Sequence, residues 1–250
     1  MSDDPKVVER HRPLRSPDVT TVEELDAPTK GERTRRRLLE AAVEAFGTQG
    51  FRAASVTAIA RTAGVTQAAS YAYFENKEHL FRSAIEVDTA GLIGEALDGV
   101  RDVPVRQLGP AFLLVALEAL DRHPLAKRVL AGAEVDALAH VRELQAVGLV
   151  TDYVAERIVE GQARGDVRPD VDPAVVADGI EALVIALLMS AVHSTQQALD
   201  RYLVGVVEAF DAMLRPAAPG PPLTPPAATT ATAAVRSACV PGATGRSTGA

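Results

Sequence analysis

Residues 55–77 constrain the fold of this chain more than any other stretch, because they predict two short helices joined by a glycine turn. In the first helix, apolar residues recur at i, i+3, i+4 and i+7, which is one helix face. Gly64 follows, where a helix end favours a residue that adopts the left-handed conformation. Thr66 can then cap a second helix, which is predicted to run to about Tyr73. The segment is thus predicted to be a helix-turn-helix, whose second helix fits the major groove of DNA.

An ordinary hairpin of two core helices would explain the pattern up to Val65 equally well. The residues that follow are less easily explained as plain core, because they combine aromatic rings with polar and basic groups. They are Tyr71, Tyr73, Phe74, Asn76 and Lys77. This cluster favours the DNA-reading interpretation over the hairpin.

Residues 30–81 resemble the N-terminal domain of the TetR family of one-component transcriptional regulators. The resemblance rests on Arg35, Leu39, Ala41, Ala42, Phe46, Gly50, Ile59, Ala60, Gly64, Val65, Tyr71, Phe74, Lys77 and Glu78. So many positions in the right order are specific, whereas a lone helix-turn-helix would be weak evidence. The resemblance implies an all-α fold, with an N-terminal three-helix helix-turn-helix DNA-binding domain and a C-terminal helical bundle for ligand binding and dimerisation.

The resemblance also assigns DNA contacts. Thr66, Tyr71 and Lys77 are expected to meet phosphates, and the Gln67 amide is expected to reach base edges, where it can pair with adenine. The full expected set is Thr34, Arg35, Arg52, Ser55, Thr57, Thr66, Gln67, Ala68, Ala69, Tyr71, Ala72, Tyr73 and Lys77. Ser70 departs from the family, which usually has a large aliphatic residue there. Long polar side chains are few, so we expect sparse base readout and more weight on phosphate contacts and DNA shape.

Charge and composition divide the chain into four segments. Residues 30–82 carry nine Lys/Arg against five Asp/Glu, a balance of +4, whereas residues 83–214 carry ten against twenty-one, a balance of −11. A basic head on an acidic body suits local, oriented contact with DNA. Residues 1–29 and the Ala/Pro/Thr-rich residues 215–250 are predicted to be a disordered leader and tail.

The second domain is predicted to be a helical bundle. Helices are expected at about residues 76–97, 111–122 and 134–164, with a further turn starting at Pro124. Gly165 is expected to end the third of these helices. Asp172 and Pro173 are a good start signal for the next, with a capping carboxylate followed by proline at the first helical position.

The last two helices have broad apolar faces, and the first of them is apolar nearly all round, so it must be buried on more than one side. The run is too short for a membrane span, which needs about 18 apolar residues. The resemblance implies a four-helix homodimer interface, and an intramolecular core is the alternative. The expected interface residues are Ile180, Leu183, Val184, Leu187, Leu188, Ala191, Leu199, Tyr202, Leu203, Val206, Val207 and Phe210.

The resemblance further implies a ligand cavity in the bundle. The candidate lining residues are Phe112, Val115, His140, Leu144, Val147, Tyr153, Met189 and His193, and for each of them ordinary core packing is the alternative. With no tryptophan and few other aromatic residues, stacking of large planar cations is poorly supported. An aliphatic or modestly amphipathic effector is preferred.

Residues for catalysis and cofactor binding are missing from the sequence. The five histidines show no metal-ligand spacing, and the chain has no glycine-rich phosphate loop, no GxSxG motif and no signal peptide. Cys239 is the single cysteine, so no disulfide framework exists, which suits the cytoplasm. We therefore expect a protein that is not an enzyme, holds no cofactor or metal and binds no membrane.

The sequence thus predicts a cytoplasmic, dimeric repressor that leaves a pseudo-palindromic operator when a small molecule binds. Two alternatives remain open. One is a DNA-binding regulator that lacks an effector or acts as an activator. The other is a helical ligand-binding or scaffold protein with a non-functional helix-turn-helix.

Overall fold

The computed structural model describes residues 29–134, 144–194 and 196–216, with side chains except those of residues 196–202. The predicted leader and tail lie almost wholly outside the described residues. Within the described ranges every regular element is a helix, which confirms the all-α prediction. The predicted site residue His140 is not described, nor are the side chains of Leu199 and Tyr202.

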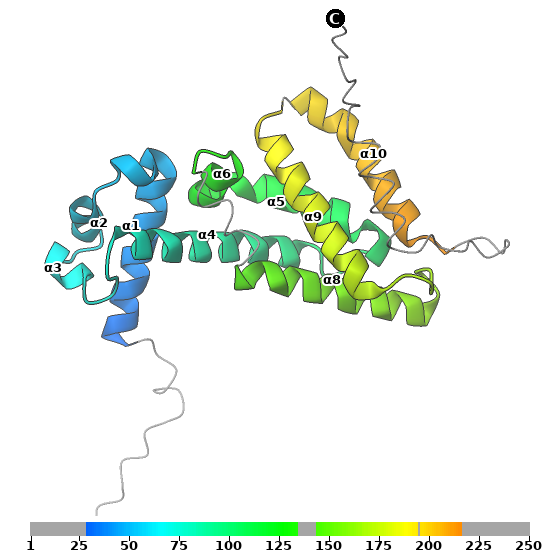
Figure 1. Cartoon of the computed structure of the whole chain (residues 1–250), viewed down its shortest axis with the longest axis horizontal. Coiled ribbons are helices and arrows are strands. Elements are labelled where there is room, and N and C mark those ends of the chain that lie inside the picture. The colour runs from blue at the N-terminus through cyan, green and yellow to red at the C-terminus, as the bar shows by residue number, and fades with distance from the viewer. Residues whose placement is uncertain (1–28, 135–143, 195, 217–250) are drawn as a thin grey trace, which may run out of the picture.

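Figure 1 shows a small helical head joined to a larger helical body by one long helix. The elements are α1 (Lys30–Ala53), α2 (Val56–Thr62), α3 (Gln67–Ser70), α4 (Lys77–Gly99), η2 (Val105–Gln107), α5 (Leu108–Ala119), η3 (Leu120–Arg122), α6 (Pro124–Leu130), α8 (Gln145–Arg164), α9 (Pro173–Val192) and α10 (Gln196–Leu214).

The head forms around α1, which begins at a capping box. The Thr29 hydroxyl accepts a hydrogen bond from the Glu32 amide, and the Glu32 carboxylate accepts one from the Thr29 amide. Phe46 is fully buried, and its ring meets Phe81 of α4 edge-on at a centroid distance of 5.0 Å. Apolar side chains of α1, α2 and α4 complete this head core.

α4 belongs to both parts of the molecule, because its first turns pack in the head and its later turns pack in the body. The predicted domain boundary at residue 82 therefore falls inside a continuous helix.

α6 is a second connection between body and head. Leu125 and Val129 of this helix are buried in the head core. A Cβ atom on Gly47 of α1 would lie only 2.8 Å from the Pro124 Cβ atom, so the glycine permits the close approach of the two helices. The head therefore rests on α6 as well as on α4.

A buried carboxylate fixes α6 to α4. One Asp88 oxygen accepts hydrogen bonds from the backbone N–H groups of Leu125 and Ala126, at 2.9 and 2.8 Å. The other oxygen lies 3.0 Å from Nδ1 of His123. Asp88 thus satisfies the first N–H groups of α6 from a neighbouring helix. The ring Nε2 of His123 faces Glu95 of α4, whose pKa is lowered, first of all by the hydrogen bond from a neighbouring arginine, Arg122.

The body core is formed by the second half of α4 together with α5, α8, α9 and α10. Gly165 ends α8 in the left-handed conformation (φ 80°), and Asp172 caps α9 ahead of Pro173, as predicted. The predicted continuous helix over residues 134–164 is wrong, because Leu144 is extended and α8 starts at Gln145.

Candidate nucleic-acid interface and ligand cavity

The turn between α2 and α3 has the predicted local chemistry. Gly64 has φ 73°, a value that glycine adopts without the strain of a Cβ atom. The Thr66 hydroxyl accepts a hydrogen bond from the Ala69 amide at 3.1 Å and caps α3. Ser55 is the N-cap residue of α2, but its side chain makes no capping hydrogen bond. α3 ends at Ser70, three residues before the predicted end, and a turn follows.

α3 presents an open surface to solvent. Thr66, Gln67, Ala68, Ala69, Tyr71 and Ala72 are all exposed. Ser70 is buried beneath them, and its hydroxyl donates to the Gln67 carbonyl at 2.7 Å rather than filling the head core. Tyr73 is half-buried and packs against the head core, so its ring is only partly available to DNA.

Three exposed side chains form a hydrogen-bonded row across α2 and α3. The Thr57 hydroxyl donates to Oε1 of Gln67 at 2.8 Å. Nε2 of Gln67 then lies 3.4 Å from the Tyr71 hydroxyl. The amide oxygen of Gln67 is therefore occupied by Thr57, while its amide nitrogen faces toward Tyr71.

Lys77 lies at the start of α4, beside the α3 surface. Its Nζ donates to the Arg52 carbonyl at 3.3 Å and sits 4.8 Å from the centre of the Phe51 ring. The ring and the carbonyl hold the ammonium group in place while it stays partly open to solvent.

The three candidates on α1, Thr34, Arg35 and Arg52, differ in exposure. Arg35 is exposed, with its guanidinium 5.3 Å from the centre of the Phe74 ring. Thr34 is buried, and its hydroxyl donates to the Lys30 carbonyl within the helix. The structure therefore turns the Thr34 hydroxyl inward and leaves Arg35 and the exposed Arg52 on the surface.

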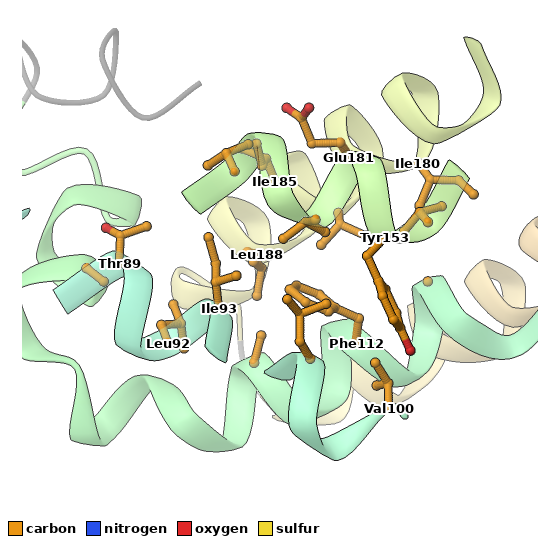
Figure 2. A pocket seen from close by; sticks show the side chains of 18 of the residues that line it. Thr89, Leu92, Ile93, Val100, Phe112, Tyr153, Ile180, Glu181, Ile185 and Leu188 are labelled. Atoms are coloured by element: carbon orange, nitrogen blue, oxygen red, sulfur yellow. The ribbon is translucent and has the colours of Figure 1, made fainter. Parts of the chain in front are cut away.

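A cavity of about 80 Å³ lies in the body (Figure 2). Its walls come from α4, α5, α6, α8 and α9. The lining residues are Thr89, Leu92, Ile93, Leu97, Val100, Leu108, Gly109, Phe112, Ala116, Ala126, Val129, Leu130, Val147, Val150, Tyr153, Val154, Ile180, Glu181, Val184, Ile185 and Leu188. Val129 and Val147 belong to the head core as well, so one wall of the cavity is shared with the head.

The predicted lining set is only partly found at this cavity. Phe112, Val147 and Tyr153 line it. Val115, Leu144 and Met189 pack in the neighbouring apolar cores without reaching it, and His193 is exposed at the end of α9. The α4 wall was missed, although Thr89, Ile93 and Leu97, which line the cavity, lie four residues apart along the chain and therefore on one helix face.

The predicted dimer residues divide into two groups. Ile180, Val184, Leu188 and Phe210 are buried inside their own chain, and the first three line the cavity. Leu187, Ala191, Leu203 and Val206 are half-buried, whereas Leu183 and Val207 are 44% and 40% exposed. The inward face of α9 therefore serves the subunit's own core.

The outward face of α9 is apolar and uncovered. Val175, Gly179, Leu183, Ala186 and Ser190 follow one another along it, and all are exposed. The expectation that this run is too short to span a membrane is wrong, because α9 is long and apolar enough by length and composition, as core helices of soluble proteins can also be. Among the described residues, no group of three or more His, Cys, Asp or Glu side chains could hold a metal ion.

Comparison with known proteins identifies relatives of both parts. Residues 38–84 match the family model described as bacterial regulatory proteins, tetR family. The HTH-type transcriptional regulator SrpR of Pseudomonas putida is 26% identical over 173 residues, which cover 67% of this chain and 79% of that protein.

Two further matches differ in how much of the chain they cover. The uncharacterised HTH-type transcriptional regulator YdgC of Bacillus subtilis is 44% identical over 57 residues, covering 23% of this chain and 29% of that protein. A TetR family regulator from Cytophaga hutchinsonii superposes with a TM-score of 0.59 at 20% identity, covering 76% of this chain and 98% of the other. The second match extends the similarity in fold through the body.

Proposed function

The chain belongs to the TetR family of bacterial regulatory proteins, and from this membership we propose that it is a repressor released from DNA by a small molecule. Proteins of this family are DNA-binding transcriptional regulators and not enzymes. The finer proposal has three parts: a homodimer, a pseudo-palindromic operator, and an effector in the body cavity. A regulator that acts on DNA works inside the cell, and we place this one in the cytoplasm.

The proposal rests on one observation: the head that carries α3 and the cavity share two helices, α4 and α6. α4 begins with Lys77 beside α3 and lines the cavity with Leu92 and Ile93. α6 contributes Val129 to the cavity and to the head core. A ligand that moves either helix would tilt the head and change how α3 meets DNA, which is a coupling between two distinct sites.

The α3 surface supports DNA contact through a few defined groups. Thr66 opens α3, and we assign it, with Tyr71, Lys77, Arg35 and Arg52, to phosphate contacts. Gln67 is assigned to base readout, with the methyl groups of Ala68, Ala69 and Ala72 close to the groove. Ser55 and Thr57 are assigned to the flank of the same surface. These assignments fit the basic head, whose net charge is +4, on an acidic body.

The outward face of α9 supports the homodimer. Two-fold regulators read two half-sites about one helical turn apart, so the second copy places a second α3 on the same side of DNA. We assign the interface to Leu183 with Val175 and the small residues of α9, together with Val204 and Val207 of α10, which are 69% and 40% exposed.

The proposal is tested by selecting binding sites for the full-length protein from random double-stranded DNA. We expect an enriched sequence with two inverted halves. Lys77→Ala should weaken binding to every enriched site alike and lower the slope of log affinity against log salt by about one, because one phosphate contact is lost. Lys127→Ala is the matched control, since this exposed lysine pairs with Asp121 on the body, and it should leave both quantities unchanged.

The alternatives give different outcomes in the same experiment. A scaffold protein with a non-functional helix-turn-helix would enrich no sequence. A regulator without an effector would enrich a site but would not release it in the presence of any ligand that raises the melting temperature. An activator would bind the site and raise transcription from it in a reporter strain.

A further inference from the structure

We infer that the cavity binds a neutral aliphatic molecule, such as an alkyl chain that ends in an uncharged group, and that it rejects anions. This inference rests on the proposed function only in treating the cavity as the effector site. The ligand chemistry follows from the lining, because only three of the lining residues, Thr89, Tyr153 and Glu181, carry a polar side chain.

The Tyr153 hydroxyl is directed away from the cavity and is held there. It accepts a hydrogen bond from Nη1 of Arg157 at 2.9 Å. Arg157 is itself fixed by the carbonyl oxygens of Arg101 and Val103, at 2.8 Å each. Figure 2 shows the ring of Tyr153 beside Phe112 and its oxygen at the far end, near Val100. The tyrosine therefore presents its ring face to the ligand, while its hydroxyl is engaged by Arg157 at the far end of the ring.

The other two polar groups also point outward. Oε2 of Glu181 accepts a hydrogen bond from the Thr151 hydroxyl at 2.9 Å. In Figure 2 the Glu181 carboxylate points away from Leu188 and Phe112, at the edge of the cluster. The Thr89 hydroxyl likewise points away from Ile93. The interior surface is consequently made of methyl, methylene and ring carbon atoms.

This lining sets the ligand class. A polar ligand group placed in the cavity would lose its hydrogen bonds to water and gain none from the walls, which is unfavourable. An anion is disfavoured further, because none of the described lining residues carries a positively charged side chain that could pair with it. Two rings, Phe112 and Tyr153, are too few to enclose a planar cation between stacked faces, whereas the leucine, isoleucine and valine side chains match an alkyl chain.

The inference predicts how affinity depends on chain length. The full-length protein is loaded with the neutral fluorescent probe N-phenyl-1-naphthylamine, which is then displaced by hexan-1-ol, heptan-1-ol and octan-1-ol. We expect affinity to rise about four-fold per added methylene, which corresponds to about 0.8 kcal/mol per buried CH₂ group. Affinity that does not change with chain length, or no binding by any alkanol, contradicts the inference.

Charged analogues of equal length test the second half of the inference. Octanoate should bind at least ten-fold more weakly than octan-1-ol. Glu181→Gln should narrow that gap, because it removes the negative charge while Gln can still accept the hydrogen bond from Thr151. A cationic ligand is the opposite outcome. It would be shown if octylamine bound ten-fold more tightly than octan-1-ol and if Glu181→Gln abolished that difference; the proposed neutral ligand class would then be wrong.

A filling substitution locates the binding site. Ala116 lines the cavity and is buried, so Ala116→Leu should place extra carbon atoms in the space and weaken octan-1-ol binding at least ten-fold. Leu114→Ala is the matched control, because Leu114 lies on the same helix but is exposed and outside the lining. Unchanged alkanol affinity in Ala116→Leu, with an unchanged melting temperature, would place the binding elsewhere.

The ligand class and the effector role can fail separately. Alkanol binding is measured without DNA, so it does not depend on repression. If alkanols bind as expected but leave the selected DNA bound, the effector role fails and the ligand class stands. If a charged ligand of another class displaces the probe and releases the DNA, the ligand class fails and the effector role stands.

Discussion

Gln67 is the one long polar side chain of α3, and its orientation determines which base it can select. Thr57 donates to the amide oxygen of Gln67, and the amide nitrogen donates one hydrogen to the Tyr71 hydroxyl, so the second NH₂ hydrogen is the group left to face a base. Bidentate pairing with adenine needs both the oxygen and the nitrogen of the amide. Guanine presents only acceptors, N7 and O6, at its major-groove edge, and it accepts from the NH₂ alone. We therefore expect the Thr57 contact to favour guanine over adenine.

Thr57→Val tests this orientation, because valine keeps the shape of threonine but cannot donate to Gln67. We expect site selection to change at one base pair in each half-site, from guanine toward adenine, by about ten-fold in relative affinity. Gln67→Ala should relax the preference at that base pair and alter no other. Thr62→Val is the control, since Thr62 is an exposed threonine at the end of the same helix. Identical selected sites for Thr57→Val and the unmodified protein would refute the orienting role.

Some residues could be placed from the sequence and others could not. Gly64 and Thr66 were predictable because the left-handed turn and the cap depend on neighbours within a few residues. Thr34 and Tyr73 were not, because their burial depends on how α1 packs against the turn after α3. Such packing between distant segments leaves no local signal in a single sequence.

Among the helices, too, some boundaries could be predicted from the sequence and others could not. α8 and α9 have strong local end signals in Gly165 and Asp172, and both boundaries were predicted. The extended residue before α8, Leu144, has no glycine or proline to mark it, and the break there was missed. α9 is apolar on two faces, so periodicity alone could not show that Ile180 faces the cavity and Leu183 faces outward.

The contact between α4 and α6 depends on one buried side chain, that of Asp88. Asp88 is buried, accepts from two backbone N–H groups of α6 and contacts His123. Asp88→Ala should lower the free energy of unfolding by about 2–4 kcal/mol, because two buried N–H groups would lose their acceptor and His123 would lose one of its two carboxylate partners. Denaturant unfolding measures this change. Asp98→Ala, on an exposed part of the same helix, should change stability by less than about 0.5 kcal/mol. An Asp88→Ala protein of normal stability would show that α6 is held by apolar packing alone.

At the scale of the whole molecule, the charge distribution and the uncovered face of α9 both favour a dimer that contacts DNA through its two heads. The acidic body, with a balance of −11, is repelled by DNA, so only the two heads of a dimer would approach the duplex. The small residues Gly179 and Ala186 on the outward face of α9 allow a second helix to come close. Solvent exposure of such an apolar face in a monomer would be unfavourable, which favours self-association.

Leu183→Glu tests the dimer directly, because Leu183 is the largest exposed apolar side chain at the centre of the outward α9 face. In a symmetric interface the substitution places a carboxylate on each side of the contact, where each is desolvated and faces like charge. We expect the unmodified protein to have the mass of a dimer at micromolar concentration in light scattering, and Leu183→Glu to have the mass of a monomer. The operator affinity should fall at least ten-fold, since one head alone contacts one half-site.

Leu149→Glu is the matched control for this experiment. Leu149 is 58% exposed on α8, so it is a leucine of similar exposure that does not belong to the outward face of α9. The control should remain dimeric and keep its operator affinity. If Leu183→Glu remains dimeric while its circular dichroism is unchanged, the interface lies on another surface. A third outcome is that the unmodified protein is monomeric and that α9 inserts into lipid vesicles. The apolar face of α9 would then bind a membrane and not a second subunit.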